Sequence, residues 1–470
     1  MATFQRLGPD HLRQLRALLG DQAVLTAADR LEAYARDETE TLRFPPEVVV
    51  LPRTAEQVAA LLAYADRELL PVTPRGGGTG LSGGALPVRG GIALSLERLD
   101  RIRAIDGRDM VVEAEAGVVT GRLQEAVEAE GLFYPPDPSS RDSCQLGGNL
   151  AEDAAGPRSL LYGTTRQYVL GLEVALADGT LLRTGGRNRK DAAGYNLTQL
   201  LVGSEGTLGV MTAAVLRLLP LPGATLSLML PFRQLDEAAA AVEGVCRASR
   251  TLAACELVER NAVRAVAAVM PVPDWLQEQE AVLLLELHGE RGEELLEEAA
   301  RLAELAESLG AGEVQAAEDA AEQRRLWAIR RQVGDAVMRR SPYKEADTVV
   351  PRSRLAELVR AARRVATSHG LEAISYGHAG DGNLHVNLLQ SGLPEGEWQV
   401  RRDAAEAELF RAVLELGGSI TGEHGIGWTQ RRHFAAAVSP RSLQLMRELK
   451  KAFDPRGILN PDKIFLEGDE

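Results

Sequence analysis

A run of glycines between residues 74 and 84, PRGGGTGLSGG, constrains the fold of this chain more than any other segment. Residues 78–83 read GTGLSG, the GxGxxG spacing of dinucleotide-binding folds. That fingerprint requires a helix directly after the glycines, whereas here they continue through a proline and two more glycines into a strand pattern. A Walker A loop is excluded because no Lys-Ser/Thr pair follows. The run therefore predicts a loop whose N–H groups wrap a diphosphate, supported by Arg75 and Thr79; a flexible surface loop is the alternative.

Length and composition limit the classes of protein to consider. A chain of 470 residues predicts two or three domains. Its net charge of −14 argues against nucleic acid and anionic membrane surfaces as partners. No apolar run is long enough to span a bilayer and the N-terminus lacks a signal-peptide pattern, which predicts a cytoplasmic protein, peripheral at a membrane only through partner subunits. Three cysteines without a CxxC pair exclude an iron–sulfur cluster in this chain.

Hydrophobic periodicity predicts an α+β protein in which the pattern of helices and strands changes near residue 223. The first part alternates helices (8–35, 54–69 and 120–131) with strands (48–52, 91–99 and 110–118) and a hairpin over 170–186 that turns at Asp178-Gly179. The second part alternates strands (225–232, 281–289, 371–380 and 384–389) with long helices (235–250, 291–309, 318–340, 353–369 and 397–416). We expect an N-terminal helical segment at 1–39 and domains at 40–220 and 221–439, with a C-terminal segment at 440–470 that returns to the first domain.

Two further loop-rich segments accompany the glycine run. Residues 135–168 are rich in Pro, Gly, Asp and Ser, and VGSEGTLG follows at 202–209. Long ordered loops in compact domains are usually functional. All these segments offer backbone amides and small hydroxyls with few bulky side chains, which suits a large, flat, phosphate-bearing cofactor.

Histidines gather in the C-terminal half. Four of the seven lie between 378 and 433, beginning with HAGDGNLH at 378–385. A turn leading into the strand 384–389 brings His378 and His385 to one side, and GEHG at 422–425 adds Glu423 and His424. Two histidines and one carboxylate leave open positions on a metal, as a catalytic site requires, and zinc, manganese or iron fits. Histidines that only form structural hydrogen bonds are the alternative. We expect His433, which follows two arginines, at the surface, and we assign no functional role to His11, His288 and His369.

These segments resemble a known family. PRGGGTGLSGG, LGGNLAEDAAGPRSLLYG (146–163) and LVGSEGTLGV (201–210) resemble the FAD-binding domain of the vanillyl-alcohol oxidase/p-cresol methylhydroxylase flavoproteins. HAGDGNLH, GEHGIG and DPRGILNPDK (454–463) resemble the C-terminal domain of its 2-hydroxyacid dehydrogenase branch, which includes D-lactate dehydrogenases, D-2-hydroxyglutarate dehydrogenase and the FAD subunit of bacterial glycolate oxidase. The resemblance spans residues 40–470. It implies an α+β fold: a two-subdomain FAD-binding domain, an α+β (ferredoxin-like) substrate or cap domain, and a C-terminal helical segment.

The resemblance also implies roles for particular residues. FAD is expected to be non-covalent, because the glycine loop has no histidine. Its site comprises Pro74, Arg75, Gly76, Gly77, Gly78, Thr79, Gly80, Ser82, Pro138, Ser139, Gly147, Gly148, Asn149, Ala154, Gly156, Gly163, Glu205, Gly206, Gly209, Val210 and Asn460. His378, His385 and Glu423 correspond to ligands of a divalent metal, often zinc; His424 corresponds to the base, Asn387 to a substrate contact, and Arg330 and Lys344 to the substrate-carboxylate pair.

Three departures from the family pattern are visible. Asp153-Ala154-Ala155-Gly156 replaces an Asn-Ala-Gly-Gly run, so we expect a tighter or shifted loop there. The Arg330–Lys344 spacing is one residue shorter than in the hydroxyglutarate branch, and Gly334 stands where that branch has a substrate-contacting Thr. Both differences weigh against hydroxyglutarate as the substrate.

The expected activity is flavin-dependent oxidation of a 2-hydroxy acid of the glycolate or D-lactate type to the 2-keto acid. The electrons then pass to a separate acceptor, either a protein such as an Fe–S subunit or a quinone, and the chain can form a homo-oligomer. Two alternatives stay open: an FAD-carrying subunit of a glycolate oxidase complex that is inactive alone, and a flavin-dependent ether-lipid synthase.

Overall fold

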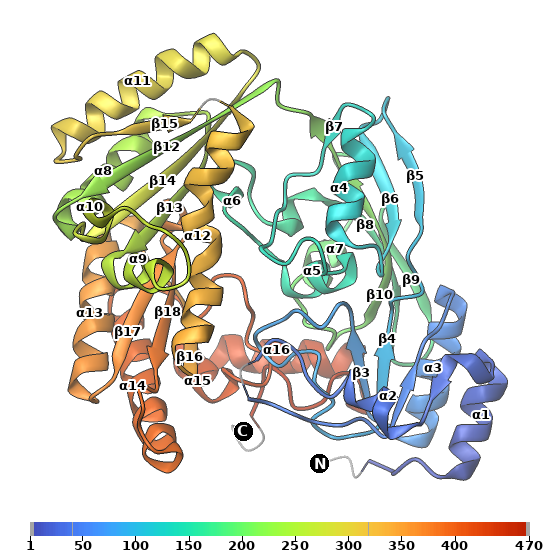
Figure 1. Ribbon diagram of the computed structural model, residues 1–470. Helices are drawn as coiled ribbons and strands as arrows, with labels where there is room; N and C mark the ends of the chain where they lie inside the picture. Colours follow the sequence, from blue (N-terminus) through green and yellow to red (C-terminus); the bar gives the residue numbers. More distant parts are fainter. Residues whose placement is uncertain (1–3, 40, 318, 467–470) are drawn as a thin grey trace. The chain divides into compact units, whose positions relative to one another are not determined.

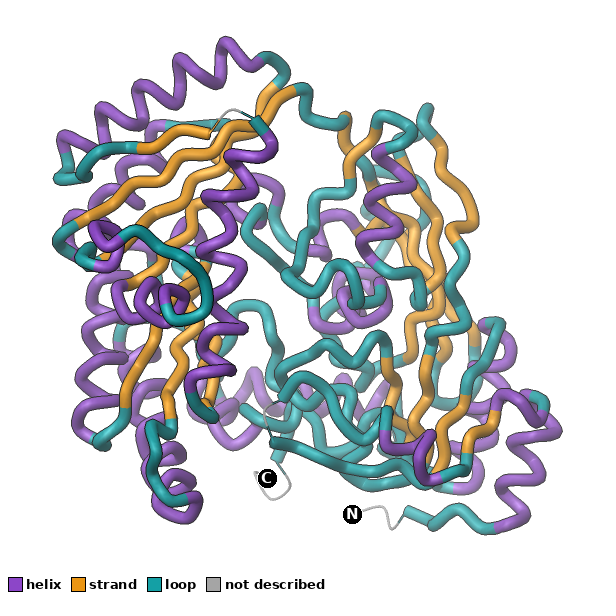
Figure 2. Tube along the Cα trace, in the orientation of Figure 1, coloured by secondary structure: helices purple, strands orange, loops and turns teal. Residues whose placement is uncertain are grey.

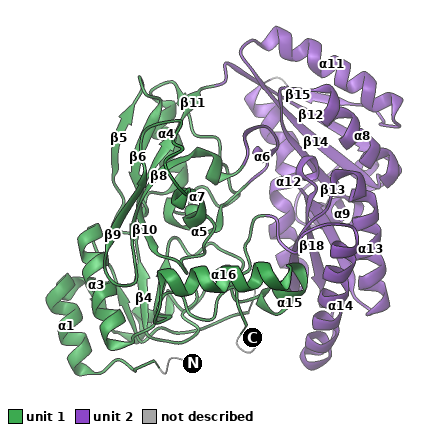
Figure 3. Ribbon diagram, turned by 180° about the vertical axis from the view of Figure 1, so that it is seen from behind, with its two compact units in different colours: residues 1–155, 164–221, 423–470 green, residues 156–163, 222–422 purple. Residues whose placement is uncertain are grey.

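The computed structural model describes residues 4–39, 41–317 and 319–466. The chain divides into two compact units, coloured separately in Figure 3. Unit 1 comprises residues 1–155, 164–221 and 423–470, and unit 2 comprises residues 156–163 and 222–422. Each unit is therefore built from segments that are distant in the sequence.

The first sheet of unit 1 has four strands in the order β1-β2-β4-β3. They are β1 (Val24–Leu25), β2 (Val48–Val50), β3 (Val72–Arg75) and β4 (Ile92–Ser95), with β2, β4 and β3 parallel. Helix α3 (Ala55–Glu68) forms the crossover from β2 to β3, two parallel strands that lie on either side of β4. Its N-cap, Thr54, accepts a hydrogen bond from Gln57 N, so the predicted helix start is confirmed. Helix α1 (Pro9–Leu19) precedes β1, and α2 (Ala28–Glu32) lies between β1 and β2 in the chain.

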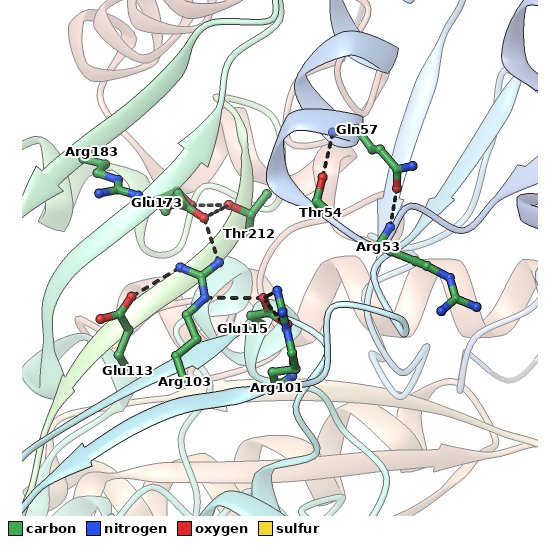
Figure 4. A network of polar contacts seen from close by, with 10 residues as sticks. All are labelled: Arg53, Thr54, Gln57, Arg101, Arg103, Glu113, Glu115, Glu173, Arg183 and Thr212. Atoms are coloured by element: carbon green, nitrogen blue, oxygen red, sulfur yellow. Dashed lines mark hydrogen bonds and ion pairs between the residues drawn. The ribbon is translucent and has the colours of Figure 1, made fainter. Parts of the chain in front are cut away.

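The second sheet of unit 1 is antiparallel, in the order β5-β6-β10-β8-β9. Its strands are β5 (Ile102–Asp106), β6 (Val111–Glu115), β8 (Val169–Ala175), β9 (Leu181–Gly185) and β10 (Val210–Arg217). Figure 4 shows the ionic network that links them: Arg103 bonds to Glu113, Glu115 and Glu173. Burial alone would raise the pKa of Glu115, but the bonds and charges of its arginine partners outweigh this and lower it.

Shorter elements complete unit 1. They are α4 (Thr120–Glu128), the ladder of β7 (Leu132–Phe133) with β11 (Leu219–Pro220), α5 (Leu146–Glu152), α7 (Leu197–Leu201), α15 (Arg431–Ala437) and α16 (Pro440–Phe453). Much of the backbone here is loop, drawn teal in Figure 2. The loop-rich prediction for 135–168 holds for residues 135–145, whereas α5 and two short helical turns lie within residues 146–168.

Unit 2 is built on one seven-stranded sheet in the order β15-β12-β14-β13-β17-β18-β16. The strands are β12 (Ala224–Phe232), β13 (Leu252–Glu259), β14 (Ala281–Gly289), β15 (Gln315–Ala317), β16 (Tyr343–Val349), β17 (Glu372–Gly377) and β18 (Asn383–Leu389), and every pairing is antiparallel. Helices α9 (Arg260–Ala267) and α12 (Ala320–Arg340) pack with Met229, Val258 and Tyr376 in one apolar core (Figure 1). The unit also contains α6 (Ser159–Tyr162), α8 (Leu235–Ala248), α10 (Asp274–Gln277), α11 (Gly292–Ser308), α13 (Leu355–Ser368) and α14 (Glu395–Glu415).

Most of the predicted elements are confirmed to within a few residues, and one is wrong. Residues 8–35 do not form a single helical segment, because Gly20 (φ +87°) ends α1 and a short strand follows. The hairpin turn at Asp178-Gly179 is confirmed, with Gly179 at φ +86°. Among the described residues, no helix has both the length and the apolar character needed to cross a bilayer.

Candidate active site

The glycine run of unit 1 packs directly against a second backbone segment. It follows β3, and a Cβ on Gly77 would lie 2.5 Å from the carbonyl oxygen of Ser143. Gly78 has φ +73°, a conformation that favours glycine. These glycines are therefore needed for close backbone approach, which agrees with a loop that wraps a ligand.

Arg75, the last residue of β3, carries an unsatisfied donor. The side chain is 8% exposed, and its Nη1 has no hydrogen-bond partner in the structure. Its guanidinium lies 5.7 Å from the centre of the Tyr34 ring. A buried cationic nitrogen without an acceptor suits a phosphate oxygen, so this part of unit 1 fits the diphosphate of FAD.

The other residues predicted for the FAD site lie in both units. Those at 138–149 and 205–210 form loops and α5 in unit 1, where Asn460 from the C-terminal segment donates to the carbonyls of Gly84 and Glu205. Gly156 and Gly163 belong to unit 2, as the flanks of α6. Asn460 thus ties together three of the predicted segments within unit 1.

Asp153 shows how one departure from the family pattern is accommodated. It ends α5 in the left-handed conformation (φ 58°), which Asn and Asp tolerate better than most residues. Its carboxylate accepts bonds from Thr164 Oγ1 and Arg166 N. Asp therefore replaces Asn at a position that suits both residue types.

The predicted histidine pair is brought together in unit 2. His378 follows β17, His385 lies on β18, and the turn at 379–381 joins the strands, as predicted. Their ring centres are 5.4 Å apart, and each offers a ring nitrogen within 4.8 Å of the other's. Both side chains are buried. Two nitrogen donors this close can coordinate one metal ion.

Each histidine also faces a carboxylate. His378 Nδ1 lies 2.7 Å from Glu256 Oε1, and His385 Nδ1 lies 3.2 Å from Glu345 Oε1. Metal-binding histidines commonly hold their second ring nitrogen against a carboxylate, which fixes the tautomer and the ring orientation. With Nδ1 of His378 bonded to Glu256, Nε2 is the nitrogen of that ring that would face a metal.

Glu256 links His378 to the predicted substrate arginine. Arg330 Nε donates to its Oε2 at 2.7 Å, and the guanidinium lies 4.8 Å from the centre of the Tyr376 ring. Burial alone would raise the pKa of Glu256, but the charges and hydrogen bonds of His378 and Arg330 outweigh it and lower the pKa to about 2. Glu256 is therefore an anion that orients both partners.

Strand register separates Lys344 from this group. Glu345 lies opposite Asn387, which in turn lies opposite Ile374, so these three side chains share one face of the sheet. Lys344 lies opposite Leu388, and neighbouring residues of a strand point to opposite faces. Lys344 Nζ lies 3.7 Å from Glu406 Oε1 of α14. The structure thus brings Arg330 toward the histidine pair but directs Lys344 to the opposite face.

Fully buried Asn387 has no hydrogen-bond partner for either side-chain amide atom, as expected of a group that binds a ligand.

Glu423 and His424 begin the last segment of unit 1. They directly follow Gly422 of unit 2, whose N–H donates to Asp347 Oδ2 at 2.7 Å. His424 Nε2 lies 3.7 Å from Glu423 Oε1. Both side chains are partly buried.

Two residues of this group, Glu256 and Glu345, were missed by the sequence reasoning. A signal for Glu256 did exist: it is a lone charge in the apolar run LAACELV, which forms a strand buried on both faces. Strand β13 itself was not predicted, so its buried acid could not be assigned to the histidines.

The fold and these sites define a flavin-binding oxidoreductase. A model of FAD-binding domains matches residues 46–185, and a model of the C-terminal domain of FAD-linked oxidases matches residues 221–464. The chain belongs to the FAD-linked oxidase family and is an FAD-dependent oxidoreductase, as the sequence predicted.

Individual relatives support this assignment. The chain is 37% identical to the glycolate oxidase subunit GlcD of Bacillus subtilis, over 92% of both chains. It is 38% identical to a D-lactate dehydrogenase of Archaeoglobus fulgidus, over 92% of this chain and 95% of that one. The solved structure of p-cresol methylhydroxylase matches with a TM-score of 0.82 at 19% identity, covering 98% and 97% of the two chains, which confirms the predicted fold.

Proposed function

We propose that this protein oxidises a small 2-hydroxy acid, of the glycolate or D-lactate type, to the 2-keto acid. The observation that carries the proposal is the group on one sheet face of unit 2: the His378–His385 pair, Arg330 held by Glu256, and the unpartnered amide of Asn387. The names of the two relatives support the substrate class.

Each side chain has a distinct role in the proposed reaction. Arg330 binds the substrate carboxylate, for which its planar guanidinium is suited. Asn387 bonds to the substrate. His424 removes the hydroxyl proton as general base, while the C2 hydrogen leaves with its electron pair. Bound FAD supplies the two-electron acceptor, at flavin N5. Lys344 was predicted to bind the carboxylate with Arg330, but its register favours Arg330 as the main carboxylate ligand.

A divalent metal is part of the proposal. His378 and His385 fit one through Nε2, because each Nδ1 faces a carboxylate. Glu423 is the proposed third ligand; it stands one residue after Gly422, which Asp347 anchors next to the strand of His385. Such an ion would lower the pKa of the substrate hydroxyl. Zinc is our first choice, with manganese or iron as alternatives.

The proposed acceptor of the electrons is a separate protein or a quinone. One relative is named as a subunit of glycolate oxidase, which favours a multi-subunit assembly. A subunit inactive alone is therefore the second candidate. Solved alkyldihydroxyacetonephosphate synthases match at 17–18% identity, and this likeness extends to the fold alone.

The decisive experiment is anaerobic titration of the FAD-loaded protein with a panel of D- and L-2-hydroxy acids, following flavin absorbance. We expect bleaching by one of the small acids, with the matching keto acid formed in equal amount. Bleaching by the isolated chain would exclude the inactive-subunit alternative. No bleaching by any member of the panel would contradict the proposed function.

A further inference from the structure

The segment that carries His424 is held by a buried carboxylate of unit 1. Glu205 accepts hydrogen bonds from Ile426 N (2.8 Å, Oε1) and Gly427 N (2.6 Å, Oε2). Its side chain is 7% exposed, so these charge-assisted bonds form away from water. Both carboxylate oxygens therefore bind the backbone two and three residues after His424.

Glu205 is itself fixed by a strained backbone and by α5. It adopts φ 52°, and its N–H donates to the carbonyl of Ala151 at 2.8 Å. Asn460 donates to its carbonyl oxygen at 2.7 Å. A non-glycine residue in this conformation persists only where its surroundings require it.

A second buried carboxyl group borders the same segment. A Cβ on Gly425 would lie 2.2 Å from Glu152 Oε2 and 3.0 Å from Glu205 Oε1, so the two acids flank the residue after His424. Glu152 Oε2 has no hydrogen-bond partner. Burial, together with the charge of Glu205, holds the pKa of Glu152 well above its usual range. Burial also raises the pKa of Glu205, against the bonds from Ile426 N and Gly427 N that favour its carboxylate form.

Further hydrogen bonds hold residues 427–429, at the C-terminal end of this segment. Trp428 N and Thr429 N donate to the Ser82 carbonyl, and Ile464 N donates to the Gly427 carbonyl. Lys463 Nζ bonds to the carbonyl of Leu86; burial lowers the pKa of this amine to about 7, and the charge of Glu205 is among the causes that oppose the shift. Residues 425–429 are consequently held on both sides within unit 1.

We propose that Glu205 is a positioning residue for His424, in addition to its place among the predicted FAD-site residues. Its carboxylate fixes the backbone at 426–427 and so sets the direction of the imidazole that takes the substrate proton. This inference rests on the proposed function for the role of His424. The geometry of the clamp itself does not depend on it.

The test compares Glu205→Gln with Glu115→Gln, a matched loss of a buried carboxylate in the same unit. Glutamine turns an NH₂ group toward one of the two N–H donors, so one bond is replaced by a clash. Misplacement of a catalytic group by about 1 Å costs about 100-fold in rate. We expect E205Q to slow flavin reduction by about that factor per bound FAD, with KM nearly unchanged, and E115Q to leave the rate within about 2-fold.

A double-mutant cycle separates positioning from general damage. If Glu205 acts through His424, E205Q should change the residual rate of His424→Ala by less than about 3-fold. An equal loss of rate in both backgrounds would overturn the proposal, as would a normal rate in E205Q. If E205Q does not fold, Gly425→Ala disturbs the same contact from the other side and is tested in the same cycle.

Amide hydrogen exchange gives a readout that needs no activity. Residues 424–429 of the FAD-loaded protein should exchange at least 10-fold faster in E205Q than in wild type, and no faster in E115Q. Unchanged exchange there contradicts the clamp. If wild type oxidises none of the acids while E205Q still exchanges faster, the proposed function fails but the clamp stands.

Discussion

At the scale of single residues, the two most informative side chains are buried acids that bond to residues of the proposed site or to the backbone next to one. Glu256 bonds to His378 and Arg330, and Glu205 bonds to the backbone beyond His424. A buried charge is costly unless it is paired. Glu256 is paired with side chains of the proposed site, and Glu205 with the backbone that follows His424. The bonds that offset the cost of burying each acid therefore also fix the geometry around the proposed site.

Replacing Glu256 by Gln should weaken metal binding. The amide cannot hold both His378 Nδ1 and Arg330 Nε as the carboxylate does. Loss of a carboxylate behind a ligating histidine typically costs 10–100-fold in affinity. Competitive titration with a chromogenic chelator measures this, with Glu259→Gln as the control. Glu259 is on the same strand, is equally buried and pairs with Arg363; equal affinity losses in the two variants would contradict the role of Glu256.

Another paired acid, Glu286, should make the free energy of unfolding depend on pH. It bonds to Arg158 and His288, and these contacts outweigh the effect of burial and lower its pKa to about 2 from the usual 4.5. A depressed pKa contributes stability that is complete above pH 4.5 and lost as the pH falls toward 2. Urea denaturation between pH 5 and pH 3 should therefore show a smaller loss of stability in Glu286→Gln than in wild type. Glu297→Gln, on the exposed surface of α11, should follow wild type, and parallel curves for all three proteins would refute the assignment.

At the scale of elements, helix α12 carries Arg330 and has a weak point at Gly334. A Cβ there would have Tyr376 Oη at 3.7 Å as its nearest neighbour, an ordinary contact. Glycine inside a helix costs about 1 kcal/mol relative to alanine. Gly334→Ala should therefore stabilise the protein by roughly that amount, as measured by urea denaturation.

The control for Gly334→Ala is Gly244→Ala in α8. There a Cβ would lie 3.0 Å from Leu309 Cδ1, so crowding offsets the gain in helix propensity. If Gly244→Ala stabilises the protein as much as Gly334→Ala does, the crowding of α8 by Leu309 is not as the structure has it, and the comparison of the two sites fails.

The sequence predicted elements well where local patterns decide them. The helix predicted over 54–69 forms α3, and the turn predicted from an Asp-Gly pair forms at Gly179. Strand β13 was not predicted, because a central strand buried on both faces lacks alternation and periodicity alone does not resolve it. Strand β16, at the edge of the sheet, was not predicted either. Without the β16–β18 register, the sequence could not show that Lys344 and Glu345 face opposite sides of the sheet.

At the scale of the whole molecule, the chain passes between its two units several times. Residues 156–163 leave unit 1 to form α6 in unit 2, and residues 423–470 return to unit 1. The second return falls between Gly422 and Glu423, within the GEHG segment of the proposed site. The residues proposed for FAD lie mainly in unit 1, together with His424, whereas His378, His385 and Arg330 lie in unit 2.

This division predicts that the two cofactors protect different parts of the chain. A ligand that binds only the native state stabilises it by about 2.7 kcal/mol at 100 times its dissociation constant. Adding FAD to the cofactor-free protein should slow amide exchange most at residues 74–82 and 145–150. Adding Zn²⁺ should slow it at 377–387, and His378→Ala should abolish that second effect alone. Zn²⁺-dependent protection that survives in His378→Ala would place the metal elsewhere, and FAD protection concentrated in β12–β14 would contradict the assignment of the flavin to unit 1.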